Sequence, residues 1–144
     1  MRRLLLIFLC GLATLVQAED EISLFSGSGD AVAYIALSDE LTIYLWSGKP
    51  VAYLSEDSSG GYHVYGFNGK HLGWFVGSVV RDHKGDAACA LKEAMNSTNF
   101  ESFKAFKQFK PFKAFQEFSP FRPSFSSSFG QIPCQFLLAS GSAN

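Results

Sequence analysis

Three histidines have the widest chemical repertoire in this chain, because imidazole can ligate a metal or act as a general base near neutral pH. They are His63, His71 and His83. If Asn68-Gly69 forms a two-residue hairpin turn, the alternation of side chains along the strands places His63 and His71 on opposite faces of the hairpin. His83 falls at another turn, beside Asp82. The sequence therefore predicts surface or capping histidines, with no metal site and no cofactor.

The chain contains the residue types that nucleophilic catalysis uses, but no arrangement of them that supports it. Serine, histidine and aspartate all occur, yet no strained nucleophile turn and no recognisable spacing joins them. Cys89 is a candidate reactive thiol, but it stands at a position that holds a small residue in every copy of an internal repeat, which favours a structural role. We expect no catalytic residues and a non-enzymatic protein.

The first 18 residues have the features of an export signal. Arg2-Arg3 supply positive charge, Leu4 to Leu15 is mostly apolar, and Val16-Gln17-Ala18 fits a small-residue cleavage site. We predict a signal peptide over residues 1–18 and an exported protein of the periplasm or the extracellular space. An N-terminal anchor that is never cut is the alternative.

Removal of residues 1–18 also removes Cys10, so that two cysteines remain, Cys89 and Cys134. An even count in an exported chain favours a disulfide between them. The bond would close a loop of roughly 45 residues and stabilise the fold by ~3–4 kcal/mol in the chain-entropy model. Two buried thiols that never meet are the alternative.

Residues 100–125 form a second stretch with chemical character, because phenylalanine recurs at every third position from Phe100 to Phe121 and lysine follows several of these rings. A polyproline II helix has three residues per turn, so it would place every phenylalanine on one ridge and the lysines on another. Pro111, Pro120 and Pro123 fit this conformation and disfavour an α-helix. The residues that we assign to this extended interaction arm are Phe103, Lys104, Phe106, Lys107, Phe109, Lys110, Phe112, Lys113 and Phe115.

Several partners suit such an arm. Docking onto its own domain or a sister subunit would take the rings out of water. At a membrane surface, phenylalanine would insert and lysine would meet the headgroups. An envelope polymer is a further candidate, whereas export makes nucleic acid an unfavourable partner. Residues 19–91 carry a net charge of −6 and residues 92–144 a net charge of +3, so the arm and the body should attract each other.

Length constrains the arm further. About 22 residues at ~3.1 Å each reach ~65–70 Å, whereas a domain of some 70 residues is ~30 Å across. The arm must therefore bend, cross onto a neighbouring subunit or stay mobile.

The scaffold beneath these groups is an internal repeat of about 20 residues within residues 22–91. Each copy is anchored on a turn glycine, and the residue four positions later is always small. Five positions later, three copies carry an aromatic residue, Tyr34, Tyr53 or Trp74, which pack in a core or line a carbohydrate-binding groove. The four turn glycines are Gly29, Gly48, Gly69 and Gly85.

Each copy predicts a β-hairpin, and Asn68-Gly69 is the strongest turn signal because a type I′ turn needs two residues with positive φ. We therefore predict an all-β fold of four repeated hairpins in a pseudo-four-fold arrangement. A connector at residues 92–99 and the arm at residues 100–125 follow it. Residues 126–144 are predicted to form a loop and a short terminal strand from Ile132 to Leu138.

The repeat also carries a resemblance. The phrases AVAYI, TIYLWSGKPVAYL, HVYGFNGKHLGWF and VVRDHKGD resemble the four-fold β-flower family of small bacterial domains, over about residues 24–90. The resemblance implies a β architecture with a four-fold arrangement, and it implies no established activity. The first and last copies depart from the pattern where Ser26-Gly27-Ser28 and Asp86-Ala87-Ala88-Cys89 replace clearer strand residues.

Together these patterns predict an exported, non-enzymatic structural or interaction module of the bacterial cell envelope. We expect it to act through self-assembly, as a homo-oligomer, or through binding to another protein. The alternative is a module that binds membrane lipid or glycan through the arm and exposed aromatic residues.

Overall fold

The computed structural model describes residues 20–143, and the predicted signal peptide, residues 1–18, lies outside the described residues. The regular elements are β1 (Glu21–Phe25), β2 (Ala31–Ala36), β3 (Thr42–Leu45), β4 (Pro50–Glu56), β5 (Tyr62–Gly66), β6 (His71–Val76), β7 (Val79–Arg81), β8 (Ala87–Ala90), the 3₁₀ turn η1 (Lys92–Ala94) and the helix α1 (Cys134–Ala139). Neither helical element of this described part has the length and hydropathy needed to cross a membrane.

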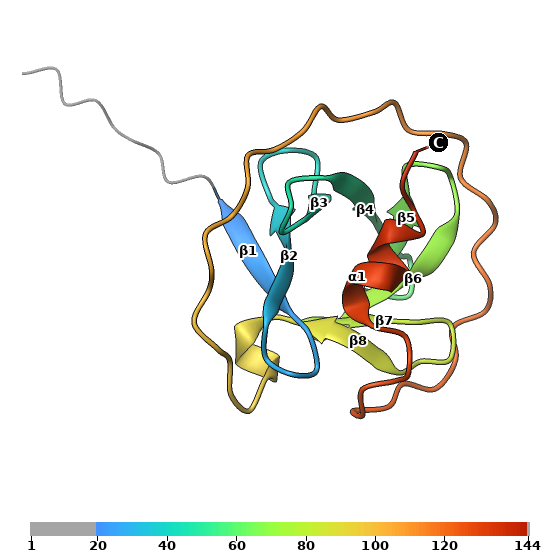
Figure 1. The fold of residues 1–144 in the computed structure, drawn as a ribbon. Helices are drawn as coiled ribbons and strands as arrows, with labels where there is room; N and C mark the ends of the chain where they lie inside the picture. Colours follow the sequence, from blue (N-terminus) through green and yellow to red (C-terminus); the bar gives the residue numbers. More distant parts are fainter. Residues whose placement is uncertain (1–19, 144) are drawn as a thin grey trace, which may run out of the picture.

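The eight strands form a closed antiparallel barrel (Figure 1). Each strand pairs with the next along the chain, and Phe25 of β1 pairs with Ala90 of β8 to close the ring. The prediction of an all-β fold is confirmed. Because the ring is closed, every barrel strand has a neighbour on both sides and none remains as an edge.

The turns that follow β1, β3, β5 and β7 share one geometry at one end of the barrel. In each, a glycine with φ between +86° and +88° donates its N–H to the carbonyl three residues earlier, and one strand shifts its register by a residue. This is a three-residue turn with a glycine bulge, and only the glycine needs positive φ. The predicted type I′ turn at Asn68-Gly69 is therefore wrong, because Asn68 is not among the residues with positive φ. Two consecutive positive φ values occur instead in the turns on the other side of the strands, at Glu40-Leu41, Gly60-Gly61 and Gly77-Ser78.

The barrel interior is a single apolar core, to which every strand contributes. Three of the small residues of the repeat, Ala33, Ala52 and Cys89, are fully buried in it. The fourth, Gly73, packs so closely that an added Cβ would lie 1.8 Å from the Arg81 carbonyl oxygen. Small residues are thus required where the strands approach one another most closely.

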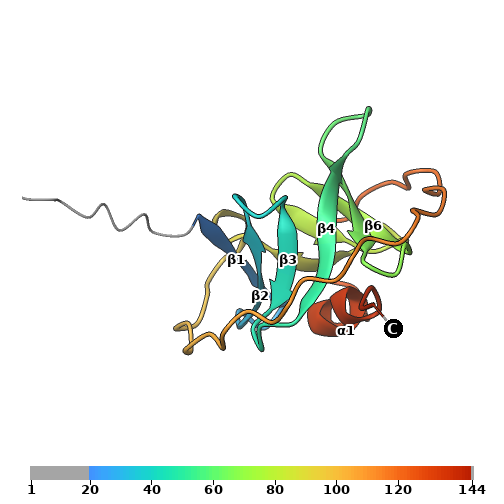
Figure 2. The ribbon, with the colours of Figure 1, turned by 90° about the horizontal axis from the view of Figure 1, so that it is seen from above.

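Helix α1 covers one end of the barrel (Figure 2). Cys134, Leu137 and Leu138 have the i, i+3, i+4 spacing of one helical face and are buried in the core, whereas Phe136 is exposed. The predicted terminal strand from Ile132 to Leu138 is therefore wrong. A ninth strand would have found no free edge in a closed barrel, and Pro133, the N-cap residue of α1, has no N–H to donate to a β-ladder.

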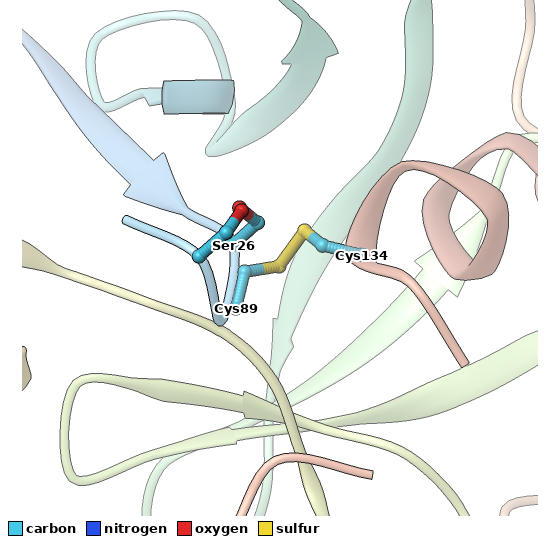
Figure 3. The surroundings of a disulfide bond; sticks show 4 residues. Ser26, Cys89 and Cys134 are labelled. Atoms are coloured by element: carbon cyan, nitrogen blue, oxygen red, sulfur yellow. A yellow bond between two sulfur atoms is a disulfide. The ribbon is translucent and has the colours of Figure 1, made fainter. Parts of the chain in front are cut away.

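A disulfide joins α1 to the barrel wall. Figure 3 shows Cys89 of β8 and Cys134 of α1 pointing toward each other, and their Cα atoms are 5.3 Å apart. These are the two cysteines that remain after the predicted signal peptide is set aside. The bond fixes the two ends of the 45-residue segment that contains the arm.

Candidate functional site

The arm, residues 100–125, contains no helix or strand and runs around the outside of the barrel (Figure 1). It therefore bends around its own domain, which is one of the courses that its length allowed. Its backbone hydrogen bonds to the glycine turns show that it follows the end of the barrel that carries them.

Hydrogen bonds fasten the arm to the barrel at intervals of nine residues. The carbonyl oxygens of the four turn glycines each accept one N–H from the arm or from the residue next to either of its ends: Asn99 to Gly29 (2.8 Å), Gln108 to Gly48 (2.9 Å), Glu117 to Gly69 (2.9 Å) and Ser126 to Gly85 (3.0 Å). A second pair keeps the same interval, because Ala105 donates to Trp46 and Ala114 donates to Phe67. Nine arm residues thus cover the distance from one turn to the next.

The turn glycines are needed for this contact as well as for their φ angles. A Cβ added at Gly48 would lie 2.0 Å from the Phe106 carbonyl oxygen, and one at Gly69 would lie 2.0 Å from that of Phe115. At Gly60, whose φ is +97° in the turn between β4 and β5, an added Cβ would meet no atom within 4 Å. Gly48 and Gly69 therefore leave the space in which the arm backbone packs, whereas Gly60 is needed only for the conformation of its own turn.

The cations of the arm point toward the barrel. The Lys104 ammonium lies 4.5 Å from the centre of the Tyr34 ring, and the Lys113 ammonium lies 4.2 Å from that of Tyr53. Lys107 lies over Tyr34 and Tyr44 at 5.9 and 5.5 Å. These are cation–π distances, and each is worth roughly 0.5–2 kcal/mol depending on solvent exposure.

Carboxylates of the barrel complete the pairing. Lys104 and Lys107 both bind Glu21, Lys110 binds Asp39 at 2.8 Å, Lys113 binds Glu40 at 3.1 Å, and Arg122 binds Asp57 at 2.6 Å. The hydrogen bond from Lys113 is the main reason why the pKa of Glu40 is lowered. Burial by itself would raise the pKa of Asp39, but hydrogen bonds from Lys110 and Tyr44 hold it below the usual value. Docking of the arm therefore favours the charged form of these carboxylates.

The last part of the arm replaces a lysine by an aromatic ring. Lys107, Gln116 and Phe125 stand nine residues apart, so they occupy corresponding positions at successive turns. Gln116 donates to the Tyr53 hydroxyl at 3.0 Å. The Phe125 ring lies 6.2 Å from that of Trp74, with the guanidinium carbons of Arg81 and Arg122 at 4.6 and 5.4 Å from its centre. A cation–aromatic contact is thus kept at this turn with other residues.

Eight phenylalanines point the other way, into solvent. Their exposed fractions run from 92% to 101%, and we call them the Phe belt: Phe100, Phe103, Phe106, Phe109, Phe112, Phe115, Phe118 and Phe121. Phenylalanine and lysine therefore lie on opposite sides of the arm, with the apolar side outward. This reverses the usual partition of residues, in which the charged side chains face water.

Tyr34, Tyr53 and Trp74 do not form an open surface. They are 1–3% exposed, because they lie on the outside of the barrel beneath the arm. The expectation that exposed aromatic residues of this series line a carbohydrate groove does not fit their burial.

The three histidines form a hydrogen-bonded chain on the outside of the barrel. His71 Nε2 lies 3.0 Å from His63 Nδ1, and His71 Nδ1 lies 2.9 Å from His83 Nε2. The prediction that His63 and His71 lie on opposite faces is wrong, because the glycine bulge pairs His71 with Tyr65, and Tyr65 shares a face with His63.

Asp57 lies at the His63 end of this chain, with its carboxylate 3.5 Å from His63 Nε2. The carboxylate can only accept, so this contact suits a proton on His63 Nε2. With all three imidazoles neutral, His71 would then donate from Nε2 to His63, and His83 would donate from Nε2 to His71. Burial, and then the neighbouring His83 and His63, lower the pKa of His71 to about 4. Within residues 20–143, no three His, Cys, Asp or Glu side chains are arranged to hold a metal ion.

The arm also contacts this histidine chain. The backbone N–H of His71 donates to the Glu117 carboxylate at 2.7 Å, and the Tyr65 hydroxyl donates to the Glu117 carbonyl at 2.9 Å. Sequence reasoning missed both contacts and the nine-residue interval. A signal for the interval was present, since Lys104, Lys113 and Arg122 stand nine apart.

The chain matches a model of a known protein family. A family model described as "4-fold beta flower protein" matches residues 22–138. The match extends past the residues that carried the resemblance and includes the arm and most of α1. No curated protein and no solved structure matches the chain significantly.

Proposed function

We propose that this chain, which belongs to the 4-fold beta flower family, is an exported, non-enzymatic interaction module of the bacterial cell envelope. It works by presenting the Phe belt to a protein partner, including further copies of itself. The observation that carries the proposal is the orientation of the arm, with eight aromatic rings in solvent and the cations turned toward the barrel.

The size of the Phe belt supports a binding role. A phenylalanine can bury 150–250 Å² of surface, so eight rings offer ~1,600 Å². The largest apolar patch on a typical monomer is about 300–600 Å². At ~25 cal/mol per Å², covering the whole belt would gain up to ~40 kcal/mol before the costs of association. An apolar surface of this extent favours a protein that works in association with others.

The scaffold of the proposal is four repeated hairpins in a pseudo-four-fold arrangement, encircled by an extended, polyproline II-like arm. Three observations support it: the common geometry of the glycine turns, their nearly equal φ values, and the nine-residue interval of the arm contacts. A structure built this way keeps the rings apart and prevents them from collapsing onto one another.

Export is supported by the disulfide. A buried Cys89–Cys134 bond suits an oxidising compartment such as the periplasm or the extracellular space. We assign no catalytic residue and no cofactor. His71 is 2% exposed, and its two ring nitrogens are both engaged by neighbouring histidines.

Protein association is favoured over lipid or glycan binding by the direction of the lysines. An interfacial membrane segment presents cations to the headgroups on the polar side of its inserted residues. Here Lys104, Lys110 and Lys113 pair with barrel carboxylates on the inner side of the arm. The same pairing removes the cations that an anionic envelope polymer would need.

The test compares the wild-type protein with a variant that carries serine at all eight belt positions. Because these side chains are exposed, the variant should keep the wild-type melting temperature and near-ultraviolet spectrum. Sedimentation velocity, co-sedimentation with phosphatidylglycerol vesicles and pull-down with cell-wall sacculi are measured for both. We expect the wild type to associate with further copies of itself in sedimentation velocity and to bind neither vesicles nor sacculi. Binding to vesicles alone would replace the proposal by the lipid alternative, and equal behaviour of both proteins in all three assays would refute a binding role of the belt.

A further inference from the structure

The Phe belt is divided into three segments of nine residues. Each begins at an arm N–H that donates to a turn glycine, so the segments span residues 99–107, 108–116 and 117–125. The first two hold three exposed phenylalanines each, and the third holds two, Phe118 and Phe121. Since neighbouring glycine turns stand around a closed barrel, each segment faces a different direction (Figure 1).

This division limits what a single partner can cover. A flat surface can touch one segment, and the other two then remain in water. One segment with three rings offers ~450–750 Å², and a matched pair buries ~900–1,500 Å² in total. A stable interface buries about 1,200–2,000 Å², so one contact lies at the weak end of that range.

The spacing of the rings suits another copy of the same ridge. Phenylalanines three residues apart on an extended arm are separated by about 9 Å. Aromatic pairs prefer centroid separations of 4.5–7 Å, so a ring from a second ridge fits between two rings at about 4.7 Å from each. Two such ridges interdigitate, whereas a smooth partner touches only the tips of the rings.

Charge does not oppose this contact. The arm cations Lys110, Lys113 and Arg122 pair with Asp39, Glu40 and Asp57 of their own barrel, and Lys104 and Lys107 share Glu21. Two belts can therefore meet without bringing unpaired cations together. A bilayer meets the belt from one direction and finds no outward lysine, which disfavours it as the occupant.

We propose that the occupant of each belt segment is a belt segment of another copy of this chain. A copy has more than one such segment facing different directions, so association continues past a dimer into open assemblies joined side by side around the barrels. This inference rests on the proposed function, because it takes the belt as a binding surface and names its partner.

The experiment is sedimentation velocity on the disulfide-bonded protein from about 1 to 200 μM. Three proteins are compared: the wild type, a variant with serine at Phe109, Phe112 and Phe115, and the variant with serine at all eight positions. We expect wild-type species larger than dimers that grow with concentration, smaller species for the first variant, and monomers for the second. Unchanged melting temperatures show that both variants fold.

Several results would overturn the inference. A wild type that is monomeric at every concentration, or that stops at a dimer, contradicts the several-segment contact. Wild-type assemblies that persist in the eight-serine variant place the contact elsewhere. A monomeric wild type that still binds a different protein through its phenylalanines overturns this inference alone and leaves the belt as a binding surface for that protein. A monomeric wild type that binds only vesicles or sacculi overturns the proposed function as well.

Discussion

Replacing Gly69 by alanine should destabilise the fold more than replacing Gly60 by alanine. The difference measures how much the packing of the arm against Gly69 contributes to the free energy of unfolding. Both glycines have positive φ, +87° and +97°, and both donate to the carbonyl three residues earlier. The backbone cost of alanine in this region is therefore similar at the two sites, about 1–2 kcal/mol. Only at Gly69 would the new Cβ meet the arm, at 2.0 Å from the Phe115 carbonyl oxygen.

The excess can be worked out from the contacts that this collision disrupts. Moving the arm away from Gly69 breaks the hydrogen bond from Glu117 to Gly69 and the one from Ala114 to Phe67. Each is worth about 1 kcal/mol net. We therefore expect Gly69→Ala to lower the free energy of unfolding by about 2 kcal/mol more than Gly60→Ala does.

The assay is urea unfolding of the disulfide-bonded protein, followed by tryptophan fluorescence at unchanged m value. Trp46 reports on the arm directly, because its indole N–H donates to the Ser102 carbonyl at 3.3 Å. Amide hydrogen exchange gives a second readout, which should speed up at Ala114 and Glu117 in Gly69→Ala and stay unchanged in Gly60→Ala. Equal destabilisation by the two substitutions would falsify the idea that the arm backbone packs against the glycine turns.

Three further predictions concern titration, the disulfide and the lysines. The pKa of His71 is about 4 in the fold against roughly 6.5 unfolded, so the unfolded state binds more protons between these values and stability should fall as pH drops through this window, by up to about 1.4 kcal/mol per pH unit. Urea titrations of His71→Gln should show a flatter profile, and an unchanged profile would contradict the assignment. Replacing Cys89 and Cys134 together by alanine should cost ~3–4 kcal/mol of unfolding free energy, measured against the oxidised wild type, and a loss below 1 kcal/mol would refute the loop-closure estimate. Trypsin at pH 8 should cleave after Lys107 and Lys113 slowly in the wild type and quickly in Gly69→Ala, because the lysines face the barrel; equal rates would show that the arm is not docked in solution.

The sequence was sufficient for the elements that depend on local pattern. Alternating apolar residues around glycine turns predicted the β fold, and the parity of the cysteines pointed to Cys89 and Cys134, which the structure joins. The three-residue step predicted that phenylalanine and lysine lie on different ridges of the arm, and they do lie on opposite sides of it.

What the sequence did not predict depends on a single backbone angle or on distant parts of the chain. Asn68-Gly69 fits a type I′ turn and a glycine-bulge turn equally well by composition, and the difference of one residue moved His71 to the face of His63. Barrel closure leaves no edge for a ninth strand, and in so short an apolar run the i, i+3, i+4 spacing of Cys134, Leu137 and Leu138 does not by itself separate a helix from a strand.

The orientation of the arm was also beyond local reasoning. Hydrophobicity alone would turn phenylalanine toward a protein and lysine toward water. The outer wall of the barrel instead offers tyrosine rings beside carboxylates, such as Tyr34 beside Glu21 and Tyr44 beside Asp39, and this surface suits ammonium groups. The preference therefore comes from the receiving surface, not from the arm.

The nine-residue interval links the length of the arm to the number of hairpins that the gene encodes. Inserting or deleting three codons in the arm would keep every phenylalanine on its outer side, yet every later N–H would miss its glycine carbonyl. Only changes of nine codons restore the match, and each such change shifts the arm by a whole hairpin. Arm length and hairpin number should therefore vary together among descendants of this gene, so that a homologue with one hairpin more carries an arm nine residues longer.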